Sequence, residues 1–244
     1  MEIAKGLHIV DGIKAPSGVS LNPLALFEDD GTVHLVDCGF PGQARVTLDY
    51  LASIGTPPSK VKSLILTHYD PDHVGSAAEI QRLTGCSIMA PEFDERVISG
   101  ERFTDDQLKE LFPKYGDEEL AALQVRLHPD PDYENIKVDK VLREGDVLNT
   151  AGETVIYHIP GHTPGLIVLF FKDLSCLAAV DSIKLFDGKV GLTKPPMTAS
   201  PKEAAESLWK LKDLDFEILI AYHSPPLMSG GSKALREYLG SLEQ

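Results

Sequence analysis

The sequence predicts a layered fold of the α/β or α+β class, and three observations support this. Short apolar runs typical of strands alternate with segments of helical spacing along the chain. The alternation occurs twice, once before residue 91 and once after residue 140. Histidine and aspartate residues directly follow several of the apolar runs. Strand ends in a layered α/β fold can share one edge, so these side chains are expected to converge there.

The first half of the chain predicts four strands and two helices. A polar turn, Glu28-Asp29-Asp30-Gly31, separates the second strand from the third. Asp72 could act as the N-cap of the second helix. The expected elements, in chain order, are the strands Ile3–Val10, Val19–Phe27 and Val33–Asp37, the helix Ala44–Ile54, the strand Val61–Leu66 and the helix Val74–Thr84.

The second half repeats this order, with strands expected around 154–159, 166–171, 176–180 and 216–220. Between the last two of these lies a predicted helix. Ser200 is suited to its N-cap, Pro201 to its first turn, and Glu203 to completing a capping box. A final helix follows Gly230-Gly231. The helix face made by four apolar residues is expected to pack in the core: Ala204, Ala205, Leu208 and Trp209.

Residues 91–140 form an acidic insertion between the two halves. They carry 14 acidic and 7 basic residues, a net charge of about −7. A fifth of the chain thus carries half of its net charge of −14. Short helices are expected over Asp105–Phe112 and Asp117–Leu127, followed by a proline-containing loop over 127–133. Such a composition is compatible with a solvated acidic surface.

The segment 66–75 is the most informative part of the chain, because it places two histidines and two aspartates within six positions. His68, Asp70, Asp72 and His73 follow the strand Val61–Leu66 on a strand-to-helix loop. Four such groups would repel or desolvate one another without a cation. Imidazole nitrogen and carboxylate oxygen bind zinc, manganese or iron at neutral pH. The segment therefore predicts a metal site, with helix capping by Asp72 as the alternative.

Three further residues of ligand type follow apolar runs downstream. His162 stands in Pro160-Gly161-His162-Thr163-Pro164-Gly165, Asp181 closes the run 176–180, and His223 follows the run 216–222. Glycines and prolines beside the two histidines favour tight turns that would hold the rings still. Four histidines show no such pattern and are expected to be structural, although the last of them could support His162 from behind: His8, His34, His128 and His158.

These motifs resemble the metallo-β-lactamase superfamily, whose hydrolases commonly carry Thr-His-x-His-x-Asp-His, a later Pro-Gly-His-Thr, a bridging aspartate and a final histidine. The resemblance extends from about Val19 to Leu227 and implies one four-layer αββα sandwich over residues 1–244. It also implies that Asp37, in an Asp-x-Gly turn, supports the ligands from behind. For the insertion over 91–140, the resemblance implies a position over the metal cleft or a subunit contact, with a solvated acidic surface as the alternative. The ligands that it implies for two divalent ions are His68, Asp70, Asp72, His73, His162, Asp181 and His223.

Asp70 is a departure from the family pattern, since most of these hydrolases have histidine there. With Asp70, Asp72 and Asp181 as ligands, two divalent ions leave a net charge of about +1, against about +2 for the usual set. Bound water should then be less acidic, and preference should shift from zinc toward manganese or iron. The flavodiiron branch also has a carboxylate there, but appends a flavodoxin-like domain for which this chain has no room. Alternatively, Asp70 turns away and one ion binds well.

The predicted function is metal-dependent hydrolysis of a small ester, lactone or thioester by a metal-bound hydroxide. Asp72 is the predicted catalytic residue, which would orient the hydroxide and pass its proton onward. The sequence has no Gly-x-Ser-x-Gly motif, so it gives no support to a serine nucleophile. Two alternatives stay open. One is a non-haem iron oxidoreductase acting on a thiol, a persulfide or oxygen, and the other is a non-catalytic metal-binding domain.

Composition restricts the partners and the location. The apolar fraction of 43% is ordinary for a globular protein, and no basic cluster suits nucleic acid or an anionic membrane. The expected partner is a small-molecule substrate, and the resemblance allows a homodimer. The chain lacks a long apolar run and a secretion signal at its start, which predicts a cytoplasmic protein. Three distant cysteines are expected as buried free thiols: Cys38, Cys86 and Cys176.

Overall fold

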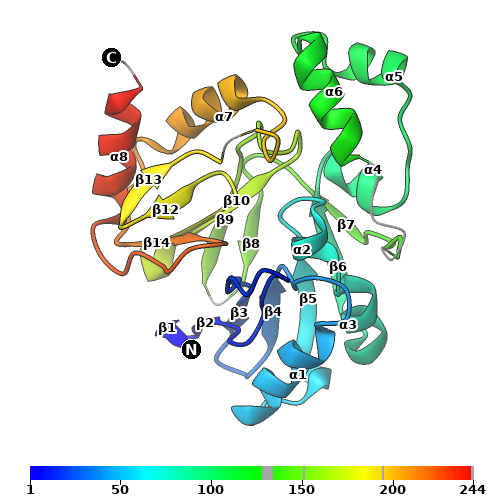
Figure 1. Ribbon diagram of the computed structural model, residues 1–244. Helices are drawn as coiled ribbons and strands as arrows, with labels where there is room; N and C mark the ends of the chain where they lie inside the picture. Colours follow the sequence, from blue (N-terminus) through cyan, green and yellow to red (C-terminus); the bar gives the residue numbers. More distant parts are fainter. Residues whose placement is uncertain (128–133, 151, 194, 243–244) are drawn as a thin grey trace.

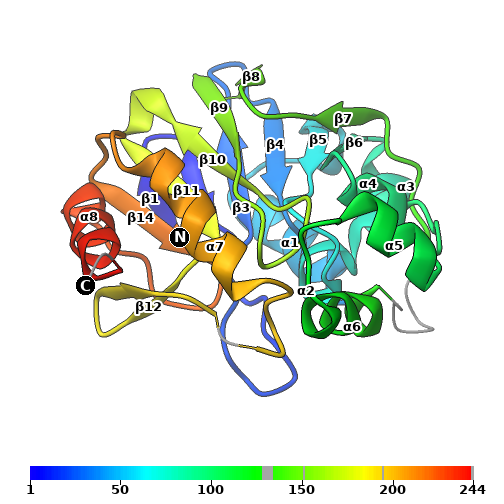
Figure 2. The same cartoon turned by 90° about the horizontal axis from the view of Figure 1, so that it is seen from above.

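The computed structural model describes residues 1–127, 134–150, 152–193 and 195–242. Two mixed β-sheets pack face to face, and helices cover their outer faces (Figures 1 and 2). This is the αββα sandwich that the sequence predicts. None of the helices in the described part of the chain is long and apolar enough to cross a membrane.

The first sheet has seven strands in the order β1-β2-β3-β4-β5-β6-β7. Its first four strands pair antiparallel, whereas β4 to β7 pair parallel. The strands are β1 (Glu2–Ala4), β2 (Leu7–Ile9), β3 (Leu24–Phe27), β4 (Val33–Val36), β5 (Val61–Ile65), β6 (Ser87–Pro91) and β7 (Lys140–Leu142).

The second sheet has five strands in the order β14-β11-β10-β9-β8, and β11 and β14 pair parallel. A separate hairpin joins β12 and β13. The strands are β8 (Val147–Asn149), β9 (Glu153–His158), β10 (Ile167–Phe171), β11 (Cys176–Val180), β12 (Lys184–Phe186), β13 (Lys189–Gly191) and β14 (Ile218–Ala221).

The α-helices fall into three groups: α1 to α3 beside the first sheet, α4 to α6 together at one end, and α7 and α8 beside the second sheet (Figures 1 and 2). They are α1 (Ala44–Ser53), α2 (Pro71–Val74), α3 (Ala77–Thr84), α4 (Asp94–Ile98), α5 (Asp105–Leu111), α6 (Asp117–Arg126), α7 (Pro201–Leu208) and α8 (Gly231–Ser241). Three short 3₁₀ helices are η1 (Pro58–Lys60), η2 (Lys172–Leu174) and η3 (Trp209–Leu211).

The core has two layers because successive side chains of a strand point to opposite faces. In β10, Leu169 packs between the two sheets and Phe170 packs under the helices. In β11, Ala178 likewise packs between the two sheets and Leu177 packs under the helices. The three cysteines are buried free thiols in these layers, as predicted. Apolar faces of both sheets are therefore removed from water, which is the main stabilising contribution to such a fold.

Two expected strands are shorter than predicted. The run Ile3–Val10 divides into β1 and β2 at Gly6, whose φ of +72° places it in a turn. The run that begins at Val19 becomes a strand only from Leu24. Asn22, just before it, donates through Nδ2 to the carbonyl groups of residues 221 and 224. This segment therefore holds the loop after β14 in place of a sheet partner.

The prediction of one helix over Val74–Thr84 is wrong. The structure has two helices, α2 and α3, separated at Gly75-Ser76. Ser76 Oγ donates to the carbonyl oxygen of Phe40 at 2.6 Å and accepts from the amide of Gln43 at 2.9 Å. The break thus lets the chain pack against the loop after β4. Asp72 lies in the first turn of α2 and is not an N-cap.

The predicted N-terminus of α7 is correct, but the capping box is not complete. Ser200 Oγ accepts from the amide of Glu203 at 3.2 Å, as a capping serine does. The carboxylate of Glu203 accepts from the hydroxyl of Tyr115 instead. That bond links α7 to the segment between α5 and α6. Ala204 and Leu208 are buried, as expected, and Trp209 is partly buried.

The insertion contains the two predicted helices, which are α5 and α6, and the additional short helix α4. The predicted proline-containing loop over 127–133, with His128, lies outside the described residues apart from Leu127. The strands β6, β7, β8, β12 and β13 have no counterpart among the predicted elements. They are three to five residues long, which is too short for a clear period in the sequence.

Candidate metal centre

The predicted ligands from the strand ends lie at one edge of the sandwich. Asp181 directly follows β11, His223 is the second residue after β14, and His68 is the third after β5. His162 lies in the loop between β9 and β10. Because β11 and β14 are parallel neighbours, their carboxyl ends bring Asp181 and His223 side by side.

The remaining three predicted ligands belong to the short helix α2 and the residue before it. Pro71 occupies the first position of α2, and Asp70 precedes it in an extended conformation. Asp72 and His73 lie in the single turn that follows. A turn this short is held by its neighbours: the backbone carbonyl of His73 accepts from the amide of Cys38 at 2.9 Å.

All seven predicted ligands fall into three overlapping groups, and the ligand atoms of each group lie within 4.8 Å of one another. We call the first group the Asp70 cluster. The groups are His68, Asp70 and His162; His68, His73 and Asp181; and Asp72, His73 and His223.

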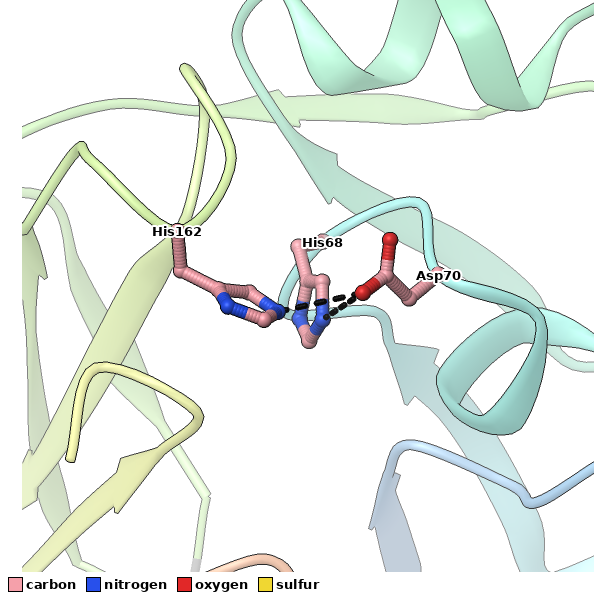
Figure 3. A group of neighbouring side chains, drawn as sticks. All are labelled: His68, Asp70 and His162. Carbon is pink, nitrogen blue, oxygen red and sulfur yellow. Dashed lines mark hydrogen bonds and ion pairs between the residues drawn. The ribbon is translucent and has the colours of Figure 1, made fainter. Parts of the chain in front are cut away.

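In the Asp70 cluster, the carboxylate of Asp70 faces both histidines (Figure 3). Its Oδ2 lies 3.1 Å from Nε2 of His162 and 3.5 Å from Nε2 of His68. The alternative in which Asp70 turns away from the other donors is therefore wrong. An oxygen and two nitrogens at these separations can bind one cation together.

Asp181, a member of the second group, links the Asp70 cluster to the third group. Its Oδ2 is 3.1 Å from Nε2 of His223, 3.5 Å from Nε2 of His162 and 3.7 Å from Nε2 of His73. A carboxylate surrounded by three imidazole nitrogens is suited to contact two cations at once.

Asp72 contacts the two histidines of the third group. Its Oδ2 is 3.2 Å from Nε2 of His223 and 3.7 Å from Nε2 of His73. The hydroxyl of Tyr222 donates to the backbone carbonyl of Asp72 at 2.7 Å, and its ring lies against that of His73. These contacts fix the turn that carries Asp72.

Asp37 supports two of the histidines through their outer nitrogens. Its Oδ2 accepts from Nδ1 of His73 at 2.8 Å and from the hydroxyl of Thr67, also at 2.8 Å. The same hydroxyl lies 3.1 Å from Nδ1 of His68. Since the hydroxyl proton goes to Asp37, the Thr67 oxygen accepts from His68. The network thus assigns the Nδ1 protons and leaves both Nε2 atoms as lone-pair donors.

The buried polar atoms test whether these residues fit a metal ion. Nε2 of His68 and Nε2 of His73 are buried and have no hydrogen-bond partner, and neither does Oδ1 of Asp181. A buried polar atom without a partner is unfavourable, so such atoms facing one another indicate a missing partner. All three belong to predicted ligands. The donor set therefore fits divalent metal ions.

The carboxylates of the centre are held in the charged form. Burial opposes ionisation of Asp70, but Arg126 and the two histidines of its cluster keep its pKa well below the usual range. Burial also acts against Asp181, and His223 and His73 outweigh it, so the pKa of Asp181 is low as well. The pKa of Asp72 is lowered in the same way by His73 and His223. The three negative charges make the centre suited to cations.

The histidines divide into two kinds. Burial, reinforced by the neighbouring His73, lowers the pKa of His68 to about 4, so its imidazole is neutral. Burial also opposes protonation of His223, but hydrogen bonds to Asp181 and Asp72 raise its pKa to about 9. Asp37 and Asp72 outweigh burial at His73 and raise its pKa well above 6.5. Without a metal ion, protons on these two rings offset part of the negative charge.

Arg126, at the end of α6, is a residue of the centre that the sequence analysis missed. Its side chain is only 10% exposed, and its Nη2 donates to Oδ2 of Asp70 at 2.5 Å. The same nitrogen lies 3.2 Å from Nε2 of His162. In the sequence, Arg126 is one arginine in an acidic helical segment, and no motif marks it. The insertion thus reaches the predicted ligands through the end of α6.

Asp94, at the start of α4, was also missed. It is fully buried and accepts from the amide of Tyr69 at 3.2 Å, the hydroxyl of Thr163 at 2.7 Å and the amide of Gly165 at 2.8 Å. A Cβ on Gly165 would lie 2.4 Å from Oδ1 of Asp94, so only glycine fits there. Burial raises the pKa of Asp94 to about 7 despite these donors. Asp94 joins the loop of His68 and Asp70 to the loop of His162.

The loop of His162 is also held from its other side. Gly161 has a φ of +131°, and a Cβ there would lie 2.2 Å from the amide nitrogen of Ala204. The start of α7 therefore packs directly on this loop, and the amide of Ser200 donates to the Gly161 carbonyl at 2.8 Å. His158 hydrogen-bonds the carbonyl of Pro164 at 2.7 Å. It thus supports the loop rather than the His162 ring.

Two other histidines have structural partners, as expected. Nδ1 of His34 lies 2.8 Å from the hydroxyl of Ser63, and its Nε2 lies 2.6 Å from the carboxylate of Glu28. Nδ1 of His8 lies 2.9 Å from the hydroxyl of Tyr50. Neither belongs to the groups that could hold a metal ion.

A pocket of about 760 Å³ opens beside the centre. Three of the predicted ligands, Asp70, Asp72 and His223, line it, together with the cations Arg126 and Lys184. Much of the remaining lining is apolar, and three of these side chains, Val125, Phe186 and Met197, are more than half exposed. The apolar lining residues include Val19, Phe40, Val125, Leu185, Phe186 and Met197. The volume and the mixed lining are typical of a site for a small organic molecule.

Known proteins resemble this chain over most of its length. A family model described as the metallo-β-lactamase superfamily matches residues 24–223. A protein of Bacillus subtilis named probable metallo-hydrolase YflN is 28% identical over 207 residues, which cover 79% of this chain and 75% of that protein. The hydroxyacylglutathione hydrolase GloC of Haemophilus influenzae is 26% identical over 218 residues, which cover 88% of this chain and 91% of that protein.

Among solved structures, a metallo-β-lactamase family protein from Thermus thermophilus superposes with a TM-score of 0.70 at 22% identity. The match covers 99% of this chain and 81% of that chain, which shows that the two share a fold. The family model spans the strand ends and every predicted ligand. The chain therefore belongs to the metallo-β-lactamase superfamily.

Proposed function

We propose that this protein is a metal-dependent hydrolase with a two-metal centre that acts on a small ester, lactone or thioester. The observation that carries the proposal is the convergence of seven nitrogen and oxygen donors beside an open pocket. The relatives named as a probable metallo-hydrolase and as a hydroxyacylglutathione hydrolase support the same class of reaction.

We assign the ligands to two metal positions on the basis of the three groups. The Asp70 cluster would hold one ion, and Asp72, His73 and His223 would hold the other, with Asp181 between them. Divalent ions bound there would supply a Lewis acid that polarises a carbonyl group and makes water more acidic.

The chain's own contribution to the reaction is assigned to Asp72 and the pocket wall. Asp72 lines the pocket and has a lowered pKa, so at neutral pH its carboxylate can accept a proton from the attacking water. Tyr222 holds the backbone of Asp72 and so keeps this acceptor in place. The apolar lining, which includes Phe186 and Met197, would hold the acyl part of the substrate and exclude water from it.

The test is a screen of esters, lactones and thioesters on protein loaded with zinc, manganese or iron. We expect turnover of at least one class that depends on the added ion. Asp72→Asn should lower kcat by about a hundredfold or more, in the range of a general acid–base group. The matched control is Asp49→Asn, an exposed residue of α1, which should leave kcat unchanged. Metal content is measured for both variants, so that lost ions are not mistaken for a lost proton acceptor.

A second candidate function rests on Asp70. Its carboxylate points into the centre, which makes the ligand set richer in oxygen and suits iron or manganese as well as zinc. A non-haem iron oxidoreductase acting on a thiol, a persulfide or oxygen is therefore the alternative proposal. Iron occupancy with oxygen consumption linked to turnover would favour it. Complete silence in both assays would favour a non-catalytic metal-binding domain.

A further inference from the structure

Arg126 brings a positive charge from the insertion into the Asp70 cluster. Its guanidinium makes two kinds of contact. Nη2 binds the carboxylate of Asp70 and lies beside the ring of His162, while Nη1 donates to the backbone carbonyls of His162, at 2.8 Å, and of Met197. The Asp70 carboxylate is 11% exposed, so both charges are largely shielded from water.

The charges of the cluster explain why such a contact is useful. A carboxylate at position 70, in place of the usual histidine, lowers the positive charge of a metal-loaded centre by one unit. A weaker positive charge makes bound water less acidic and a carbonyl less polarised. Arg126 adds one unit of positive charge at the same carboxylate oxygen. Because guanidinium stays protonated at any pH compatible with folding, this charge is permanent.

We propose that Arg126 is a positioning residue whose fixed charge offsets Asp70, so that the Asp70 cluster acts on a bound cation like a set of neutral histidines. The pair replaces one histidine with a carboxylate and a guanidinium that together carry no net charge. This inference rests on the proposed metal centre but not on the proposed substrate.

The competing role for Arg126 is purely structural. Its Nη1 bonds tie α6 to the His162 loop and to Met197, and that tie alone could explain the burial of the side chain. The two roles differ in their dependence on Asp70. A structural tie works equally well with any residue at position 70, whereas charge compensation requires the carboxylate. A double-mutant cycle separates them.

The experiment compares four full-length proteins: wild type, Arg126→Met, Asp70→His, and the double variant. The melting temperature of chelator-treated protein and the zinc dissociation constant, from competition with a chromophoric chelator, are measured for each. With Asp70 in place, Arg126→Met should lower the metal-free melting temperature, because it leaves a buried carboxylate unpaired. It should also tighten zinc binding by about tenfold or more, since a repelling charge is removed.

In the Asp70→His background, Arg126→Met should lower the metal-free melting temperature clearly less than it does with Asp70 in place. The Nη1 contacts are lost in both backgrounds, but a buried carboxylate is left unpaired only where Asp70 is present. Arg126→Lys keeps the charge but loses the paired carbonyl contacts. It should keep zinc affinity within about threefold of wild type, a threefold change being only about 0.65 kcal/mol.

The proposed compensation would be overturned if Arg126→Met lowered the melting temperature equally in both backgrounds. It would also be overturned if, with Asp70 present, Arg126→Met left the zinc affinity unchanged or weakened it. Neither readout is activity, so failure of every hydrolysis assay would leave the result standing. If wild type takes up no zinc, manganese or iron at all, the metal centre itself is refuted, which is a different outcome.

Discussion

Oδ2 of Asp37 accepts a hydrogen bond at 2.8 Å from Nδ1 of His73, the nitrogen that points away from the centre. Through the Thr67 hydroxyl the same oxygen is linked to Nδ1 of His68. One buried carboxylate, 1% exposed, thus orients two rings and leaves their inner nitrogens free to bind an ion. Partners of this kind fix the tautomer of a ligand and raise its basicity.

Replacing this carboxylate should weaken the metal centre without removing any ligand. We predict that Asp37→Asn lowers the affinity for the first zinc or manganese ion by about 10- to 100-fold. The side-chain amide has one oxygen, so it cannot accept from the Thr67 amide on one side and from the Thr67 hydroxyl and His73 on the other. Titration against a chelator of known affinity measures the change. An affinity equal to that of wild type would show that Asp37 does not orient the histidines.

The metal-free protein should lose stability as the pH rises. The pKa of His223 is raised from 6.5 to about 9 by Asp181 and Asp72. A histidine whose pKa is raised by folding stabilises the folded state fully below pH 6.5, and this stabilisation is lost as the pH rises through 9. The loss from this one group amounts to at most about 3 kcal/mol. Urea denaturation of chelator-treated protein between pH 6.5 and 9 measures it.

Two comparisons make this prediction specific. His223→Asn, which cannot titrate, should flatten the decline of stability over the same pH range. Metal-loaded wild type should also show little decline, because bound ions require neutral imidazoles. A metal-free wild type whose stability stays constant or rises from pH 6.5 to 9 would contradict the assignment.

Asp94 should matter for stability and for the position of the ligand loops. Asp94→Asn keeps the shape of the side chain, but one of the three donors from Tyr69, Thr163 and Gly165 then faces an amide NH₂ group. A buried donor without an acceptor costs about 1–3 kcal/mol. Asp94→Asn should therefore lower the melting temperature. The control Asp213→Asn, at an exposed position, should leave the melting temperature unchanged. Equal melting temperatures for Asp94→Asn and wild type would show that this tie contributes nothing.

The apolar lining of the pocket should determine preference for the acyl part of the substrate. Phe186 is 58% exposed and lines the pocket. On a series of esters, Phe186→Ser should reduce kcat/KM for long acyl chains relative to short ones by roughly a factor of ten. A change of this size is expected when about 1–2 kcal/mol of apolar contact is lost. Val147→Ser is the control, since Val147 is 59% exposed on β8 and does not line the pocket. A uniform effect on all chain lengths would place the acyl group elsewhere.

Much of the fold could be predicted from the sequence because its long elements carry a clear period. The sequence predicts the helix over Ala44–Ser53 and the strands before His68 and Asp181 within a few residues, and it predicts where the last helix, Gly231–Ser241, begins. The helix after His73 was not, because its division at Gly75-Ser76 depends on hydrogen bonds to a distant loop. Such contacts leave no local pattern.

The candidate site could likewise be predicted only in part. The seven predicted ligands are brought together, since each follows a strand or opens a helix at one edge of the sheets. Arg126 and Asp94 could not be predicted, because their importance comes from tertiary contacts. The partners of Arg126 are 36 or more positions away in the sequence, and those of Asp94 are 25 or more positions away. An arginine in an acidic helix and an aspartate at the start of a short helix look like surface residues in the sequence.

The central claim is that these donors bind a pair of cations, and metal uptake tests it most directly. Purified protein is loaded with zinc, manganese or iron, dialysed, and its metal content determined by elemental analysis. We expect about two ions per chain for wild type, a lower content for His68→Ala, and the wild-type content for His8→Gln. A wild-type protein that retains no stoichiometric transition-metal ion under any loading condition would contradict the account.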